Sequence, residues 1–191
     1  MPNAMQVCGY LWLAFYTCWF LAAFIAKRAK QKVDWGGRMR YVIPVALAYL
    51  LMFNRDLNIG YLGYRLIPRT APIGVAAIAI TVTGMLFAAW ARVYLGRNWS
   101  SVPVIKEGHE LICGGPYRLV RHPIYSGFLL AMAGTCLANG RVRGLLSVIL
   151  IAIGWIIKSR MEEIFMVQTF GTQYEDYRRT TGGIFPRLFH S

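Results

Sequence analysis

Residues 71–95 read APIGVAAIAITVTGMLFAAWARVYL, and Arg92 is the only charged side chain among them. A helix that crosses the hydrocarbon core of a bilayer needs about 20 mostly apolar residues. The run meets that length, and 57% of the whole chain is hydrophobic. We therefore expect a membrane-spanning helix here, and we expect the chain to be an integral membrane protein and not a soluble protein with a large hydrophobic core.

Four more apolar runs accompany this one. Residues 7–26 are long enough to span, lack a basic segment before them and are followed by basic residues, so we expect a retained span and not a signal peptide. Residues 41–53 form a shorter run with Pro44 near its start, which we expect to span with little tilt or to lie partly in the interface. Residues 124–137 and 145–157 flank ANGRVRG, which predicts a helical hairpin. The fold class is therefore all-α integral membrane, with about five transmembrane helices, the fourth and fifth forming the hairpin.

The formal net charge is +13, but the basic residues cluster around the apolar runs and do not line one soluble face. Membrane topology explains this pattern better than nucleic-acid binding, which we exclude. The loop between the first two runs holds one acid, Asp34, and six basic residues: Lys27, Arg28, Lys30, Lys32, Arg38 and Arg40. The positive-inside rule places this loop in the cytoplasm and the amino terminus outside. Arg141 and Arg143 would then lie outside, which is too small a bias to reverse the orientation.

Residues 54–72 are predicted to be an external loop with Tyr61 and Tyr64 as interfacial anchors. The four cysteines show neither a CxxC pair nor a repeated spacing with histidine, so we expect no metal site.

A polar segment, residues 96–123, follows the third run, and its end, GGPYRLVRHPIYSG at residues 114–127, concentrates groups that hydrogen-bond or stack. Pro123 biases His122 away from the α region and suits the first turn of a helix. Amide groups at that helix start, beside basic side chains, are suited to an anionic group. For His122 itself we favour an orienting role over acid–base work.

Glu162 and Glu163 are two of only eight acidic residues, and they follow the fifth run beside Lys158 and Arg160. Ionisable groups near hydrocarbon are costly unless they are paired or face a cavity, which favours a functional cluster. The alternative is a solvated interfacial helix with ordinary ion pairs. Beyond it, a helix is expected to end near Gly171, and Thr172 with Glu175 fits a capping box that would start a short helix carrying Tyr174 and Tyr177 on one face.

These motifs together resemble the isoprenylcysteine carboxyl methyltransferase family of integral membrane enzymes and, more distantly, the phospholipid N-methyltransferases. The resemblance spans roughly residues 96–186, and its pieces stand in the family's order: Asn98-Trp99-Ser100, Gly108-His109-Glu110-Leu111, Gly115-Pro116-Tyr117-Arg118, Arg121-His122-Pro123-Ile124-Tyr125, Glu162-Glu163, Phe170-Gly171 and Tyr174-Glu175-Asp176-Tyr177.

The resemblance implies that S-adenosylmethionine binds at the cytoplasmic edge of the membrane. The cofactor-contacting positions that it implies are His109, Glu110, Leu111, Ile112, Tyr117, His122, Pro123, Ile124, Tyr125 and Glu162. Residues 1–95 would supply three transmembrane helices, and residues 96–191 would form the catalytic region. Lys158 falls where the family usually has an arginine that faces the acceptor, and Arg160 is the nearby alternative. Lys158, Arg160 and Glu162 are therefore the expected catalytic residues.

The implied reaction is methyl transfer to a lipophilic acceptor, the carboxylate of an isoprenylcysteine or a similar prenylated thiol. Three alternatives stay open: a phospholipid amine N-methyltransferase, a sterol-type membrane reductase that uses NADPH, and a non-catalytic membrane protein. The lipid bilayer and a lipophilic substrate are the expected partners, with the active site and carboxyl terminus in the cytoplasm.

Overall fold

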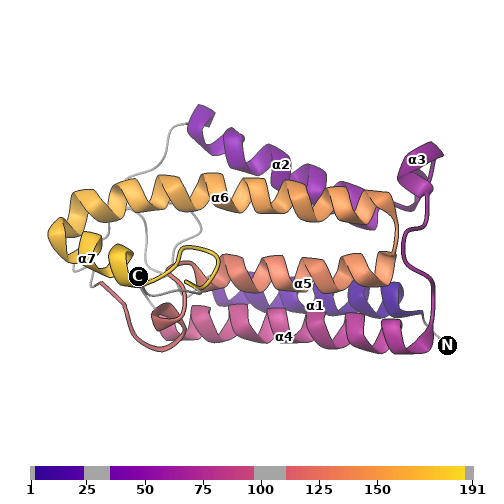
Figure 1. Cartoon of the computed structure of the whole chain (residues 1–191), viewed down its shortest axis with the longest axis horizontal. Helices are drawn as coiled ribbons and strands as arrows, with labels where there is room; N and C mark the ends of the chain where they lie inside the picture. The colour runs from indigo at the N-terminus through magenta and orange to yellow at the C-terminus, as the bar shows by residue number, and fades with distance from the viewer. Residues whose placement is uncertain (1–2, 24–34, 97–110, 188–191) are drawn as a thin grey trace.

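The computed structural model describes residues 3–23, 35–96 and 111–187. Within them the regular structure is helical, and Figure 1 shows five long helices that run side by side along the molecule. These are α1 (Ala4–Ala23), α2 (Trp35–Phe53), α4 (Ala71–Leu95), α5 (Pro123–Asn139) and α6 (Val142–Phe170). The short elements are α3 (Gly60–Gly63), α7 (Thr172–Thr180) and two 3₁₀ turns, Arg55–Leu57 and Gly115–Arg118. The all-α prediction is confirmed.

Three of the five predicted spans are long and apolar enough to cross a membrane, within Ala4–Ala22, Ala71–Leu95 and Val142–Phe170. The other two predicted runs also form helices, α2 and α5. In the part of the chain that the structure covers, neither meets the same length and composition: α5 has only 17 residues, and α2 is long enough at 19 residues but is less apolar, with Arg38 and Arg40 in its first turns. Their passage through the membrane stays a prediction.

Small residues let α4 and α5 pack backbone to backbone. A Cβ atom on Gly84 of α4 would lie 2.6 Å from the carbonyl oxygen of Gly127 on α5, and one on Gly134 would lie 2.5 Å from the amide nitrogen of Thr81. Ala88 and Ala131 are fully buried in the same interface. Small residues are how membrane helices approach closely. This contact holds the start of α5 beside the end of α4.

The hairpin between α5 and α6 is confirmed, and its turn is tighter than the seven residues expected. Gly140 adopts a left-handed conformation (φ 63°) directly after α5, and α6 begins at Val142. From there α6 continues unbroken to Phe170, so the predicted fifth span and the charged segment after it form one helix. That continuity carries Lys158, Glu162 and Glu163 on an extension of a spanning helix.

The predicted stop at Gly171 and the short helix after it are confirmed, but the capping box is wrong. Gly171 (φ 54°) is itself the N-cap of α7 and makes no side-chain cap bond. The chain reverses at this glycine, so Thr172 is already helical and Glu175 donates its backbone N–H to the Gly171 carbonyl at 3.3 Å. Tyr174 and Tyr177 do share a face, with ring centroids 6.0 Å apart.

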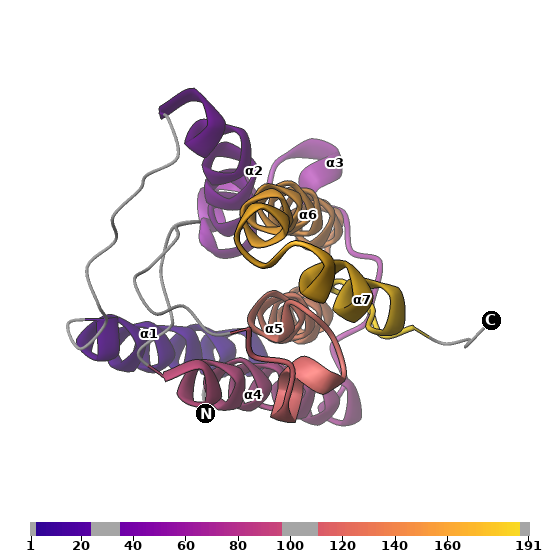
Figure 2. The same cartoon turned by 90° about the vertical axis from the view of Figure 1, so that its left-hand side faces the viewer.

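The predicted loop of residues 54–72 contains the first 3₁₀ turn and α3. Tyr61 and Tyr64 are 90% and 63% exposed there, as their predicted role as interfacial anchors requires. Figure 1 shows this segment at one end of the molecule and α7 with the carboxyl-terminal segment at the other. In the end-on view of Figure 2, α7 lies across the ends of α5 and α6.

Candidate functional site

Five side chains from two segments meet at the α7 end of the bundle, and we call them the His122 cluster: Arg121, His122, Tyr125, Glu162 and Glu163. The first three lie at the start of α5, and the two glutamates lie one turn after Lys158 on α6. The hairpin brings the two segments together, because α5 and α6 run antiparallel from the turn at Gly140. Residues about 40 positions apart in sequence thereby become neighbours.

The backbone around His122 is fixed by the carboxyl-terminal segment. Arg121 donates its backbone N–H to the Gly182 carbonyl at 2.8 Å, and His122 donates its own to the Gly183 carbonyl at 3.2 Å. The hydroxyl of Ser126 donates to the carbonyl of Ile184 at 2.5 Å. His122 has φ −123° and ψ 60°, outside the α region as Pro123 predicts, and Pro123 is the first residue of α5. The turn is therefore held from two sides.

Hydrogen bonds and ion pairs connect the whole cluster. Arg121 donates from Nε and from a terminal nitrogen to Glu163 Oε1, at 3.0 and 2.7 Å. His122 places Nε2 3.1 Å from Glu163 Oε1 and Nδ1 3.6 Å from Glu162 Oε2. The Tyr125 hydroxyl donates to Glu162 Oε1 at 2.5 Å. A second terminal nitrogen of Arg121 donates to the carbonyls of Arg178 and Thr181. The side chains around Glu162 thus form a connected network, and their predicted function stays a prediction.

Two opposing effects set the protonation of His122. Burial disfavours the imidazolium and lowers the pKa, whereas the hydrogen bonds and negative charges of Glu162 and Glu163 raise it. The carboxylates outweigh burial, so the pKa of His122 lies above its ordinary value. Both ring nitrogens are within reach of a carboxylate, which suits a protonated, orienting histidine.

Aromatic rings line the site beside the cluster. The rings of His122 and Tyr125 are stacked at 5.5 Å, and those of Tyr125 and Trp155 at 4.8 Å. The Lys158 ammonium lies over three rings, 5.2 Å from Tyr125, 5.5 Å from Tyr41 and 5.6 Å from Trp155. Lys158 is only 7% exposed. The rings therefore form a region suited to positive charge, because their faces are electron-rich.

Two polar atoms in this aromatic region have no hydrogen-bond partner among the residues that the structure covers. They are the Tyr41 hydroxyl and the Trp155 indole nitrogen, and both are buried. Buried polar groups are nearly always paired, so these two donors are groups that a bound ligand would satisfy.

The remaining predicted site residues lie at varying distances from this network. Tyr117 is buried, its hydroxyl reaches the Ala91 carbonyl at 3.5 Å, and its own carbonyl accepts from the Tyr177 hydroxyl at 2.5 Å. Ile124 packs against the hydrophobic core. Leu111 and Ile112 are half-buried. His109 and Glu110 lie outside the described residues.

Arg160 is exposed, and within the described residues no hydrogen bond or ion pair joins it to the cluster, whereas Lys158 is buried beside the cluster. Of the two acceptor-binding candidates, the structure brings only Lys158 to the site. The roles of both residues stay predictions.

Sequence reasoning missed Tyr41, Trp155 and the Gly182–Ile184 segment. Trp155 lies three residues before Lys158, a spacing that puts both on one helical face, so the helix period was a usable signal. A side chain on Gly182 would collide with the Phe185 carbonyl oxygen, which requires glycine in the segment that pairs with Arg121. Tyr41 comes from α2 and had no local signal.

Comparisons with known proteins agree with this arrangement. The family model described as phospholipid methyltransferase matches residues 73–173, just over half of the 191 residues. A probable protein-S-isoprenylcysteine O-methyltransferase of Oryza sativa subsp. indica is 35% identical over 112 residues, 55% of this chain and 56% of that protein. The protein-S-isoprenylcysteine O-methyltransferase of Schizosaccharomyces pombe is 31% identical over 107 residues, 54% of this chain and 45% of that protein. The methanethiol S-methyltransferase of Pseudomonas deceptionensis is 38% identical over 74 residues, 38% of this chain and 27% of that protein.

The alignments span about half the length, or less, of these curated relatives. The family match nevertheless runs from the start of α4 to the start of α7 and contains every side chain of the His122 cluster. The resemblance predicted from the motifs is confirmed. The chain belongs to the phospholipid methyltransferase family, together with proteins named protein-S-isoprenylcysteine O-methyltransferase.

Proposed function

We propose that this protein transfers a methyl group from S-adenosylmethionine to a lipophilic acceptor, the carboxylate of an isoprenylcysteine or of a similar prenylated thiol. The observation that carries the proposal is Glu162, which contacts His122 and Tyr125 beside a wall of aromatic rings in the region that the family model matches. The names of the rice and fission-yeast relatives support the acceptor class.

The residues present fit the cofactor's chemistry. S-adenosylmethionine carries a sulfonium, an amino group, a carboxylate and ribose hydroxyls. The rings of Tyr125 and Trp155 suit the sulfonium, and the Glu162 carboxylate suits the amino or ribose groups. The unpaired Tyr41 hydroxyl and Trp155 N–H are further donors for the cofactor's oxygens. When bound, the cofactor supplies an electrophilic methyl group.

The side chains of this protein then position two reactants and exclude water. A carboxylate acceptor is ionised at neutral pH, so no residue has to remove a proton from it. Arg121 and His122 hold Glu163 and Glu162 in place through the bonds described above. Lys158 is the cation nearest to Glu162 on α6 and would bind the acceptor's carboxylate. Alignment of two reactants in this way lowers the activation barrier by about 7 kcal/mol or more when the geometry is ideal.

A phospholipid amine is the second candidate acceptor, because the family model is described as phospholipid methyltransferase. An amine must lose a proton before it can attack. Both nitrogens of His122 face carboxylates, and the raised pKa of His122 favours its charged form, which is a poor base. These observations favour the carboxylate acceptor over the amine.

We further propose that the site faces the cytoplasm. Arg38 and Arg40, near the start of α2, belong to the basic loop that the positive-inside rule assigns to that side, and Figure 1 places the start of α2 toward the α7 end. The carboxyl-terminal segment that holds His122 would then be cytoplasmic as well.

Titration of the purified protein with S-adenosylhomocysteine, with NADPH as the parallel ligand, tests the proposal. Saturable binding of S-adenosylhomocysteine alone is expected, and Glu162→Gln should weaken it about tenfold or more, because a charge-assisted hydrogen bond is lost. Arg160→Gln, an exposed change two residues away, is the matched control and should bind normally. Binding of NADPH alone would replace the proposal with a reductase, and unchanged affinity in Glu162→Gln would remove Glu162 from the site.

A further inference from the structure

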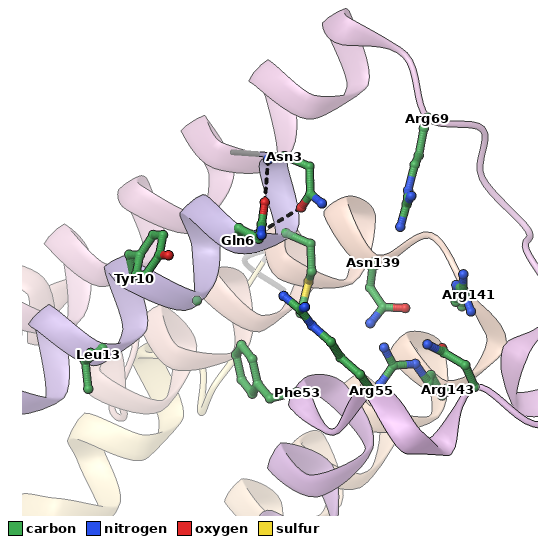
Figure 3. Close-up of a pocket in the computed structure, with 13 residues that line it drawn as sticks. Asn3, Gln6, Tyr10, Leu13, Phe53, Arg55, Arg69, Asn139, Arg141 and Arg143 are labelled. Atoms are coloured by element: carbon green, nitrogen blue, oxygen red, sulfur yellow. Dashed lines mark hydrogen bonds between the residues drawn. The ribbon is translucent and has the colours of Figure 1, made fainter. Parts of the chain in front are cut away.

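A second polar pocket lies at the opposite end of the bundle from the His122 cluster. Its volume is about 460 Å³, and it is formed by the start of α1, the segment after α2 and the turn between α5 and α6. Figure 3 shows its lining, in which the side chains of Arg55, Arg69 and Arg143 converge around Asn139. The pocket shares no residue with the proposed methyl-transfer site.

Four arginines line this pocket: Arg55, Arg69, Arg141 and Arg143. No aspartate or glutamate is among the lining residues, and the ion pairs found within residues 3–23, 35–96 and 111–187 involve none of the four. Arg65 lies close by, since its backbone forms a bridge with that of Arg141, and burial together with the positive charges of Arg69 and Arg141 lowers its pKa. A concentration of guanidinium groups with no carboxylate repels itself unless an anion is present.

The deepest arginine is built into the fold. Arg143 is 5% exposed, and one terminal nitrogen donates to the carbonyls of Leu51 and Asn54 at 2.7 and 2.6 Å, which caps the end of α2. Asn139, 3% exposed, donates to the Met52 carbonyl at 3.2 Å. The Arg143 Nε and the Asn139 Oδ1 are buried with no partner in the described chain. A rigid donor and acceptor therefore remain unsatisfied in the pocket wall.

Part of the opposite wall is apolar. Beyond the polar Asn3 and Gln6 at the start of α1, Tyr10 and Leu13 line the pocket and are 65% and 67% exposed, and Phe53 is also in the lining. α1 is one of the helices long and apolar enough to span a membrane, so these exposed side chains are suited to contact with lipid. The pocket thus joins a cationic floor to a surface suited to an acyl chain.

We propose that this pocket binds a phosphate-bearing anion, held by Arg55, Arg69 and Arg141 above the buried Arg143. Arginine suits phosphate because its planar guanidinium donates two parallel hydrogen bonds. The adjoining apolar wall allows the phosphate to belong to a phospholipid headgroup, and the pocket's open side admits a free phosphate as well. Such an anion would also offset the positive charge that this end of the molecule carries against the positive-inside rule.

The experiment is a thermal-unfolding titration of the detergent-purified full chain with three probes: micelles containing phosphatidylglycerol, micelles containing diacylglycerol, and inorganic phosphate. Arg55 and Arg69 are exposed and their side chains make no hydrogen bond within the described fold, so Arg55→Gln/Arg69→Gln should fold normally. The matched control, Arg178→Gln/Arg187→Gln, removes two exposed arginines from the other end. If the double variant does not fold, Arg69→Gln alone replaces it.

Phosphatidylglycerol should raise the unfolding temperature more than diacylglycerol does. The apparent affinity for phosphatidylglycerol should be about tenfold weaker in Arg55→Gln/Arg69→Gln, since two charge-assisted hydrogen bonds are lost. The control variant should bind as the native protein does. Stabilisation by phosphatidylglycerol but not by inorganic phosphate identifies a lipid as the source of the phosphate, and stabilisation by both identifies a site for the free anion. Equal effects of phosphatidylglycerol and diacylglycerol, or equal affinities in the two double variants, would overturn the proposal.

Discussion

Lys158 is the residue that we propose binds the acceptor. Its ammonium lies over three rings and is nearly fully buried, so a carboxylate that enters the site meets a desolvated point charge. Arginine at this position would bind the same carboxylate through two parallel bonds. We therefore propose that the site has a cofactor side around Glu162 and an acceptor side around Lys158.

Lys158→Ala should raise the KM for a prenylated carboxylate acceptor about tenfold or more, because one charge-assisted hydrogen bond to the carboxylate is lost. The affinity for S-adenosylhomocysteine should stay unchanged, and Lys158→Arg should restore most of the acceptor affinity. Steady-state kinetics beside a binding titration measures both quantities. Loss of cofactor binding in Lys158→Ala would show that the two sides are not separate.

His122 gives the site a dependence on pH. The pKa of His122 in the folded protein is raised above its ordinary value of about 6.5. The pairing of His122 with Glu162 and Glu163 therefore stabilises the folded state fully when the pH is below about 6.5. The contribution should be lost as the pH rises through the folded pKa. The unfolding temperature should therefore fall above neutral pH in the native protein. His122→Gln keeps a hydrogen-bonding side chain without a titrating one, and parallel slopes for the two proteins would contradict the assignment.

At the scale of the elements, the close packing of α4 on α5 determines where His122 lies. Gly84→Ala should destabilise the fold by about 1–3 kcal/mol, because the added methyl group meets backbone atoms that cannot move aside. Gly9→Ala on α1 is the matched control, since nothing lies within 4 Å of its added Cβ, and it should be neutral or slightly stabilising. Unfolding of both variants in detergent measures the difference. Equal stabilities would show that the helices separate more easily than their packing indicates.

The elements themselves were largely predictable, because apolar length and glycine turns are local signals. All five apolar runs form helices, and the stop at Gly171 was correctly located. The hydrophobic pattern alone did not reveal that α6 is one helix of 29 residues, which runs from Val142 through the charged segment to Phe170. The capping box failed because a positive φ at Gly171 starts α7 one residue early.

The candidate site was predictable only in part. Local motifs in two segments predicted His122, Tyr125 and Glu162 as site residues, and the structure brings them together, whereas the contributions of Tyr41 and of residues 182–184 depend on contacts between distant parts of the chain. Such contacts leave no periodicity in the sequence. The same reason explains why Arg55, Arg69, Arg141 and Arg143 were not expected to share one pocket.

At the scale of the whole molecule, the two ends of the bundle carry different chemistry. The α7 end joins carboxylates, aromatic rings and Lys158, and the other end gathers arginines without carboxylates among its lining residues. The helices α5 and α6 connect both ends, and their turn contributes Arg141 and Arg143 to the arginine pocket. The described part of the carboxyl-terminal segment, residues 181–187, makes its hydrogen bonds at the α7 end, so it offers a way to disturb that site while leaving the arginine pocket intact.

A chain that ends at Thr180 should keep its helical bundle and lose binding of S-adenosylhomocysteine. The truncation removes the carbonyls of Gly182, Gly183 and Ile184, which fix Arg121, His122 and Ser126, and it leaves all five long helices complete. Circular dichroism should show nearly unchanged helix content, and the affinity should fall at least about tenfold, since several hydrogen bonds that order the site are lost together. A chain that ends at Arg187 is the control, because it retains every one of those bonds. Normal binding by the shorter chain would mean that the hairpin alone orders the site, and the carboxyl-terminal segment would then be only a cover over it.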